Sequence, residues 1–369
     1  MKICEISWFK EFECLCGKCP RTCCKGWVIP LSDEDCERFG KERGWLGVRL
    51  FFAVRGWTAK KFNSSSGRCS FLRRDGLCTL QKQKGHEFIP WTCQSFPRFY
   101  RNFGEFEERC LDLSCTGAAR LFMKHKGATD LIVSEGDPVT RMCTTNDDRQ
   151  LMDYLLDIRR EMMEVCVSED PVIASDALFL FAGRLQDMFS KGGDELPSLS
   201  FRHFYEERME EHPESSYCFP LPANILGDFL GSSLFHIRLR KIDPELYRRF
   251  NKAKKYIARF CNALRAWKKT ALQAVSEDPL LKKTLGRYLA YYLFQYFLRA
   301  YETYSFRRQV ALGLCHMNMI LLLAVAKEDT DGITEETLAD TIAVYNRRAF
   351  FNDDIQDQMY RIFENGYRK

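Results

Sequence analysis

Cysteine is distributed unevenly along this sequence, and this constrains the fold more than any other feature. Twelve of the 17 cysteines lie within the first 115 of 369 residues, and the stretch CGKCPRTCC at residues 16–24 contains four of them. Gly17 and Pro20 mark turns in that stretch, so its thiols do not follow the period of a buried helix or strand. The N-terminal third is therefore predicted to be irregular, with thiols gathered for a purpose other than core packing.

Composition and charge exclude several classes of protein. The chain is 46% apolar and 14% aromatic, which indicates a compact globular protein rather than a disordered one. Its 55 basic and 50 acidic residues are interleaved, which argues against nucleic-acid binding. The N-terminus lacks the apolar run of a signal peptide, and the longest apolar run, 319–326, is far shorter than the ~20 residues of a transmembrane segment. A soluble, cytoplasmic protein is expected.

In the reducing cytosol, a dense cysteine pattern indicates a metal site rather than a set of disulfides. Other cysteines also lie beside turn signals. Asp75-Gly76 in CSFLRRDGLC predicts a short hairpin that brings Cys69 and Cys78 together. In IPWTCQSFPRF, a proline on each side of Cys93 predicts a loop rather than a regular helix. Ser114 or Thr116 is expected to begin the helix that follows Cys115.

Thiolate ligands select zinc, cuprous copper or iron–sulfur clusters. Zinc sites favour two short-spaced pairs of ligands, whereas most of these cysteines are single and scattered, so the pattern favours iron–sulfur. A four-iron cluster takes four thiolates, and this region has more than that. The alternative of buried, reduced thiols suits Cys166, Cys261 and Cys315, which lie in apolar helical patterns.

The fold class expected from these patterns is mostly α: a small irregular Cys-rich metal-binding domain with little β, followed by an all-α helical domain. The predicted divisions are residues 1–125, a connection at 126–146, and 147–369. DDRQLMDYLLDIRREMMEVCV predicts an amphipathic helix, and DPLLKKTLGRYLAYYLFQYFLRAYETY predicts a central helix buried all round. His316 lies in an apolar helical segment and is expected to be a core histidine, whereas His86 is a candidate ligand near Cys93.

Four motifs together resemble a known family. FECLCGKCPRTCCKGWVIPLSDED, CSFLRRDGLCTL, WTCQSFPRF and LSCTGAARLF are similar, in that order, to the Cys-rich putative zinc- or iron-chelating domain, and especially to its flagellin lysine-N-methylase branch. Weaker similarity continues through YLAYYLFQYFLRAYETYSFRRQVALGLCHMNMILLLAVAK to DTIAVYNRRAFFND, so it covers nearly the whole chain.

The resemblance implies a bacterial cytoplasmic enzyme that carries a 4Fe-4S cluster and moves methyl groups from S-adenosylmethionine to flagellin lysines. It implies cofactor contacts at Trp27 and Arg98, and it implies metal ligands among Cys16, Cys19, Cys23, Cys24, Cys69, Cys78 and Cys93. Cys14 and Cys115 also match positions of the methylase branch. Which four cysteines bind the metal stays open at this point.

The sequence departs from three familiar methylase patterns. No Gly-rich turn follows a predicted strand, so the common S-adenosylmethionine-binding fold is not expected. The radical-enzyme motif C-x3-C-x2-C is also absent, and the family's terminal Glu-His pair is replaced by Phe350 and Phe351. Two alternative functions therefore accompany the methylase: a zinc-stabilised protein-binding module, and an electron-transfer iron–sulfur protein.

Overall fold

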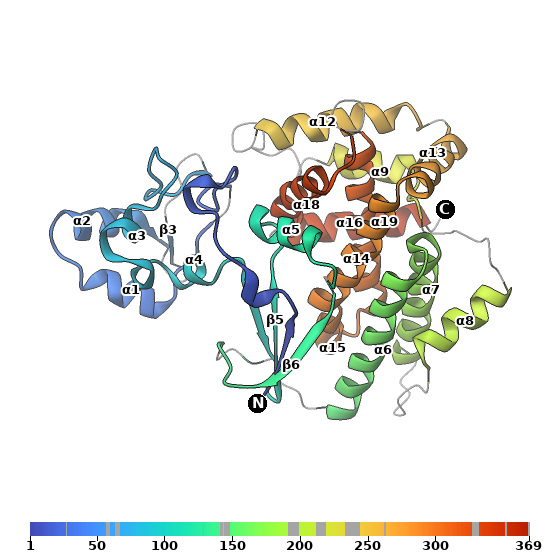
Figure 1. Ribbon diagram of the computed structural model, residues 1–369, viewed down its shortest axis with the longest axis horizontal. Helices are drawn as coiled ribbons and strands as arrows, with labels where there is room; N and C mark the ends of the chain where they lie inside the picture. Colours follow the sequence, from blue (N-terminus) through green and yellow to red (C-terminus); the bar gives the residue numbers. More distant parts are fainter. Residues whose placement is uncertain are drawn as a thin grey trace.

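A computed structural model gives the fold of this chain. It describes residues 1–26, 28–56, 60–62, 67–127, 129–140, 143, 148–190, 199–211, 219–232, 244–261, 263–326, 332–350 and 353–367. A small lobe lies at one end of the molecule, a sheet lies in the middle, and a large body of helices lies at the other end (Figure 1). The predicted fold class, mostly α with an irregular N-terminal region, is confirmed.

The small lobe contains short elements around an apolar core of its own. These elements are α1 (Asp33–Gly40), α2 (Gly44–Ala53), β2 (Val54–Arg55), β3 (Lys61–Phe62), α3 (Thr79–Lys84) and α4 (Trp91–Ser95). Helix α1 begins with a capping box, in which Ser32 accepts from the backbone N–H of Asp35 and the Asp35 carboxylate accepts from that of Ser32. The lobe's core consists of side chains from residues 29–89, among them Phe39, Phe62 and Phe71.

The sheet has the order β4-β5-β1-β6. Its strands are β1 (Lys2–Ile6), β4 (Arg98–Asn102), β5 (Phe106–Leu111) and β6 (Leu131–Glu135). Strand β1 pairs in parallel with β5 and antiparallel with β6, so the chain's first strand is completed by segments about 100 residues away. The predicted connection at 126–146 thus contains a strand. Its residues show no alternation because β6 is exposed on both faces, and backbone pairing joins it to β1.

The helical body includes long helices that follow the sheet. Those described are α5 (Thr116–Lys124), α6 (Arg149–Ser168), α7 (Pro171–Ser190), α8 (Phe201–Glu211), α9 (Ala223–Gly231), α12 (Pro244–Ala258), α13 (Leu264–Glu277), α14 (Pro279–Tyr296), α15 (Ala300–Thr303), α16 (Phe306–Val325), α18 (Glu335–Ala349) and α19 (Asp353–Tyr367). Helix α6 is the predicted amphipathic helix, and its apolar face is buried. The larger core also takes in Ile6 to Phe12, β5 and α5, so the N-terminal strand packs with the helices.

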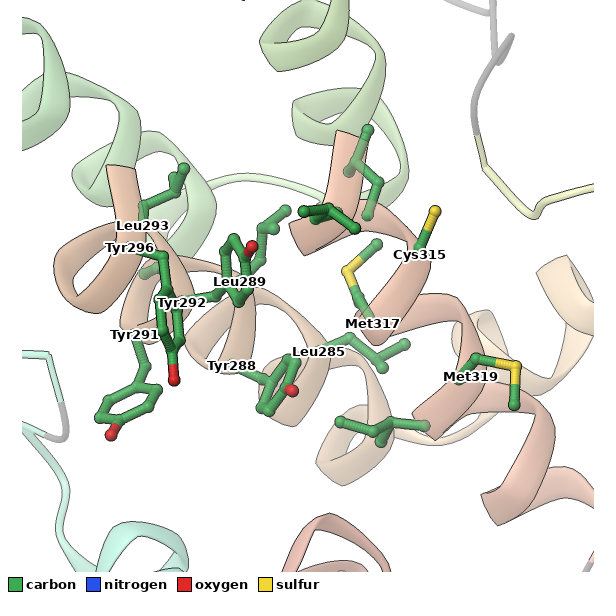
Figure 2. Packing of buried hydrophobic residues seen from close by; sticks show 14 of the residues in the cluster. Leu285, Tyr288, Leu289, Tyr291, Tyr292, Leu293, Tyr296, Cys315, Met317 and Met319 are labelled. Atoms are coloured by element: carbon green, nitrogen blue, oxygen red, sulfur yellow. The ribbon is translucent and has the colours of Figure 1, made fainter. Parts of the chain in front are cut away.

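Helices α14 and α16 form the centre of this core. Residues 284–296 of α14 are buried on every side, which confirms the predicted central helix. Figure 2 shows tyrosines of α14 and sulfur-containing side chains of α16 in the packed region between these helices and their neighbours. The two helices approach closely because Gly313 lacks a side chain: a Cβ there would lie 2.7 Å from a ring carbon of Tyr292.

Among the described helices, α16 is the one long and apolar enough to cross a membrane by length and composition. It is enclosed by other helices of the fold, including α7, α14 and α19. A buried core helix passes the same test of length and composition, so this finding is weak evidence for a membrane span.

Candidate metal centre

A cavity of about 480 Å³ lies between the opening loop of the chain, the small lobe and the start of α5. Nine cysteines line it: Cys14, Cys16, Cys19, Cys23, Cys24, Cys69, Cys78, Cys93 and Cys115. All seven cysteines predicted as metal ligands are in this set. The opening loop, the Asp75-Gly76 hairpin and the segment around Cys93 therefore line one cavity.

Backbone pairing brings the opening loop to the small lobe. The N–H of Cys69 donates to the carbonyl of Cys24 over 2.9 Å, and the N–H of Gly26 donates to the carbonyl of Gly67 over 2.8 Å. An isolated bridge joins Lys25 and Arg68 between these two bonds. Cys24 and Cys69 thus lie on adjacent, antiparallel segments, although 45 residues separate them in the sequence.

The Asp75-Gly76 turn brings Cys78 beside Cys69. Gly76 has φ of +79°, a conformation that glycine adopts readily, and the N–H of Arg73 donates to the carbonyl of Leu77. The Asp75 carboxylate accepts from the N–H of Leu77, which closes the turn. The predicted hairpin is confirmed, and Cys78 follows it at the N-terminus of α3.

Cys93 lies on α4, so the prediction that a loop carries it is wrong. The two prolines bound a helix of five residues instead of preventing one, because Pro90 lies at the N-cap, where a missing N–H costs no helical hydrogen bond. The buried Asp35 carboxylate, which caps α1, also accepts from the N–H of Trp91 at the start of α4. Asp35 thereby fixes the position of the helix that carries Cys93.

Four of these thiols share an apolar environment. Cys69 is buried in the small-lobe core, and Cys24, Cys78 and Cys93 pack against that core. Burial raises the pKa of Cys69 to about 11 and also raises the pKa of Cys78 and of Cys93, and the charges of neighbouring thiolates add to each effect. Thiolates crowded in this way are unfavourable on their own, but a bound cation would stabilise them.

Cys24 differs from the other three thiols. The Cys23 thiol donates a hydrogen bond to the Cys24 sulfur, and this, together with the Thr22 hydroxyl, Arg347 and Arg68, lowers the pKa of Cys24 to about 6 against the effect of burial. The same hydrogen bond raises the pKa of Cys23. These contacts favour the thiolate form of Cys24, the form that binds a metal or attacks an electrophile.

The remaining cavity cysteines form a second group. Cys14, Cys16 and Cys19 follow one another around a tight turn, in which the N–H of Cys16 contacts the Cys14 sulfur at 3.4 Å and the N–H of Cys19 donates to the carbonyl of Cys16. Cys115 is the N-cap of α5, the position predicted for Ser114 or Thr116. Burial, followed by the charges of Cys19 and Cys14, raises the pKa of Cys115 to about 11 against the lowering effect of the N–H groups that begin α5.

The helical body holds the cysteine turn through arginines. Arg347 of α18 lines the cavity and donates to the carbonyls of Thr22 and Lys25, on either side of Cys23 and Cys24. Arg21 extends in the opposite direction, from the opening loop to Glu245 of α12 at 2.8 Å and Asp340 of α18 at 3.2 Å. The Arg21 guanidinium lowers the pKa of Glu245 to about 2.

The other predicted site residues have different environments. Trp27 lies outside the described residues. Arg98 lines the cavity, donates to the carbonyl of Phe12 over 3.1 Å and packs on the Phe12 ring. His86 also lines the cavity. His316 is fully buried in α16, remote from the cavity lining, and its Nδ1 lies 2.8 Å from the Tyr345 hydroxyl, which confirms the expected core histidine.

A single metal ion needs its ligands close together. Tetrahedral Zn–S bonds of about 2.3 Å place sulfur atoms about 3.8 Å apart. Among the described residues, no three or more histidine, cysteine, aspartate or glutamate side chains are arranged to hold one metal ion.

Sequence reasoning missed two residues that organise this site. Asp35 was indicated by a Ser-x-x-Asp capping pattern, but nothing in the sequence shows that the same carboxylate also anchors α4. Arg347 lies more than 320 residues after the turn that it holds, and no local pattern predicts such a contact. Phe350, at the first position of the Glu-His pair absent from this chain, packs on His316, and Phe351 lies outside the described residues.

Comparison with known proteins identifies relatives of this chain. Residues 177–369 match the family described as the FliB lysine N-methylase C-terminal domain. The chain is similar to a protein named Lysine-N-methylase from Salmonella choleraesuis (strain SC-B67), with 28% identity over 119 residues, which is 30% of each chain. It is also similar to the flagellar biosynthetic protein FliU of Salmonella muenchen, with 29% identity over 119 residues, which is 30% of this chain and 70% of that one.

The matched segment spans about 30% of the length of the lysine-N-methylase. No solved structure matches this chain.

Proposed function

This chain belongs to the FliB lysine N-methylase family, and from that premise we propose that it transfers methyl groups from S-adenosylmethionine to lysine side chains of flagellin in the bacterial cytoplasm. We also propose that the cysteine-lined cavity holds an iron–sulfur cluster that the reaction requires. The names of the relatives support lysine methylation and a flagellar substrate.

The observation that carries the proposal is the convergence of Cys24, Cys69, Cys78 and Cys93 on one cavity wall. Four thiolates are the ligand set of a 4Fe-4S cluster, and a cluster spreads its ligands further apart than one zinc ion does. Cys23 would remain beside the cluster as the donor to Cys24.

Three of these four cysteines would be enough to hold a cluster, and the iron left without a thiolate would then be open to the amino and carboxylate groups of S-adenosylmethionine. The cavity volume of about 480 Å³ is within the range of small-molecule sites. Arg98 lines this space and carries the charge needed to pair with a carboxylate. Residues of the small lobe, including Phe62 and Phe71, supply the apolar wall that excludes water.

Methyl transfer by direct attack needs a neutral lysine amine, whereas a free lysine has a pKa near 10.4. Burial in the cavity lowers the pKa of a lysine, and Arg347, which lines the cavity, would add to that effect as a like charge. Arg21 contributes little positive charge there, because it is paired with Glu245 and Asp340.

The test combines metal analysis with a methylation assay. Protein purified without oxygen is expected to be brown, to contain iron and acid-labile sulfide, and to transfer labelled methyl groups from S-adenosylmethionine to flagellin lysines. Cys93→Ser should lose both the iron and the labelling. Cys36→Ser is the matched control, because Cys36 is a half-buried cysteine of α1 that is absent from the cavity lining.

Three results would contradict the proposal. Cys93→Ser protein that keeps both its iron and its methylation would show that this thiol group is not required. A colourless protein with stoichiometric zinc and no labelling would indicate a binding module. A cluster that cycles between redox states without labelling any lysine would indicate electron transfer.

A further inference from the structure

Helix α2 of the small lobe leaves an apolar face exposed to solvent. Its sequence, GWLGVRLFFA, contains a single charged residue, Arg49. Leu50 and Ala53 are buried in the core of the small lobe, and Leu46 packs against that core. Four other apolar side chains of the helix are exposed, namely Trp45 at 77%, Val48 at 47%, Phe51 at 76% and Phe52 at 60%.

These four side chains form one patch. Positions 45, 48 and 52 follow the i, i+3, i+7 spacing of a single helix face. Phe51 lies beside that face, because its ring contacts the Phe52 ring with centroids 5.4 Å apart. Single exposed apolar side chains are normal on a protein surface, whereas a contiguous patch marks a site that binds a protein or a membrane.

The sequence around this patch is strongly basic. Between residues 43 and 74 the chain has eight basic residues and no acidic one, whereas basic and acidic residues are nearly balanced over the whole chain. Arg43, the N-cap of α2, is exposed, and so is Arg55, two residues after the end of the helix. Positive charge therefore lies at both ends of the apolar patch, which suits an anionic partner.

A pair of like charges points to an anionic partner independently. Arg55 of β2 lies directly opposite Lys61 of β3 in the two-stranded sheet that follows α2, and both residues are exposed. Like charges at directly opposite positions destabilise an antiparallel pair. An anionic group bound at this position would remove the repulsion between them.

The position of α2 favours a lipid surface over a protein partner. The helix lies at the outer end of the small lobe, away from the helical body (Figure 1). A partner helix is usually bound in an apolar groove, whereas a helix with exposed Trp and Phe and flanking Arg and Lys lies in the headgroup layer of a membrane. Its ten residues are too few to span a bilayer, so α2 would lie in the membrane plane.

We propose that α2 attaches this protein to an anionic lipid surface. Trp45, Phe51 and Phe52 enter the headgroup region, where aromatic side chains are favoured. Arg55 and Lys61 lie at the lipid phosphates. This inference goes beyond the proposed function, because it concerns where the protein is held, and none of these five residues lines the cysteine-lined cavity.

Co-sedimentation of the full chain with lipid vesicles tests the proposal. The wild type should bind vesicles of phosphatidylcholine mixed with phosphatidylglycerol, should bind phosphatidylcholine alone more weakly, and should lose affinity as the salt concentration rises. Trp45→Ser/Phe51→Ser should weaken binding to the mixed vesicles by at least about tenfold. Arg55→Gln/Lys61→Gln should weaken it by about 30-fold.

Matched controls remove exposed side chains of the helical body. Val167→Ser/Met188→Ser takes two exposed apolar side chains from α6 and α7. Arg265→Gln/Lys269→Gln takes two exposed charges from α13. Both controls should bind the mixed vesicles as the wild type does.

Tryptophan fluorescence measures insertion with a conservative variant. Lipids that carry bromine on their acyl chains should quench part of the emission of the wild type. Trp45→Phe keeps an aromatic ring in the patch, so it should bind the vesicles with nearly unchanged affinity and lose most of that quenching. Unchanged quenching in Trp45→Phe would contradict insertion of α2.

Three further results would overturn the proposal: wild-type protein that does not sediment with the mixed vesicles, Trp45→Ser/Phe51→Ser protein that binds them with wild-type affinity, and wild-type protein that binds polyglutamate but no vesicle. The last result would assign the patch to an acidic protein. Methylation of soluble flagellin is a separate measurement, which the α2 variants should leave unchanged. Protein that binds vesicles but labels no lysine would contradict only the proposed function.

Discussion

Mild acid should destabilise this protein through His316. The imidazole is fully buried in α16, with Nδ1 at 2.8 Å from the Tyr345 hydroxyl and, among the described residues, no partner for Nε2. Burial lowers the pKa of His316 from the usual 6.5 to about 3. The folded protein therefore keeps this side chain neutral at a pH where the unfolded chain binds a proton.

The size of the effect follows from the two pKa values. Because the folded pKa is the lower one, the contribution to stability is complete above pH 6.5 and is lost as the pH falls toward 3. Each pH unit of acidification within that window lowers the free energy of unfolding by about 1.4 kcal/mol. Between pH 7.5 and pH 5, His316 alone should lower the free energy of unfolding by about 2 kcal/mol.

Urea unfolding at these two pH values measures this loss. The substitution His316→Gln removes the titrating group. Between pH 7.5 and pH 5, the free energy of unfolding of the variant should therefore fall by about 2 kcal/mol less than that of the wild type. Its stability at pH 7.5 is expected to be lower, because the contact with Tyr345 changes, and the comparison therefore uses only the difference between the two pH values. His203→Gln is the control, because His203 is exposed and pairs with Glu207 on α8.

Equal acid losses in the wild type and His316→Gln would refute this reasoning. They would mean that His316 either takes up a proton within the fold or is replaced as the acid-sensitive group by carboxylates. A His203→Gln protein that loses its acid sensitivity would have the same consequence.

Three other substitutions test the contacts that support the site and the core. Arg347→Ala should cost about 2 kcal/mol, because charged hydrogen bonds to the cysteine turn are lost, and iron content should fall while far-ultraviolet circular dichroism stays unchanged. Gly286→Ala should cost about 3 kcal/mol in denaturant unfolding, because the new Cβ would lie 2.2 Å from the backbone oxygen of Cys166. Arg159→Leu should cost about 3–5 kcal/mol by leaving the buried Glu108 carboxylate unpaired, and adding Glu108→Gln should recover part of that loss.

Local patterns in the sequence predicted local structure well. The turn at Asp75-Gly76, the apolar face of α6 and the burial of α14 all follow from short-range chemistry or helical period, and the structure contains each of them. The helix α4 was missed because two prolines were taken to exclude a helix. A proline disrupts a helix only at positions where the backbone N–H would donate a helical hydrogen bond. Pro90 is the N-cap of α4 and precedes those positions.

The long-range parts of the fold had no comparable signal. The pairing of β1 with β5 and β6 joins segments that neither alternate in polarity nor lie near each other in sequence. The cysteine count predicted a metal site, but not that the opening loop packs on α5, where Gly117 leaves room for Phe12 and Leu15.

The hydrogen bonds from Arg347 to the cysteine turn also have a consequence for biosynthesis. A ribosome makes the turn first and reaches the arginine only after 325 further residues, which takes tens of seconds at about 5–20 residues per second. During that interval the nascent thiols are reduced but not held in place by α18. Iron and sulfide delivered during that interval would reach a loop that does not yet have its hydrogen bonds to α18. The metal centre is therefore expected to assemble after the last helices have been synthesised.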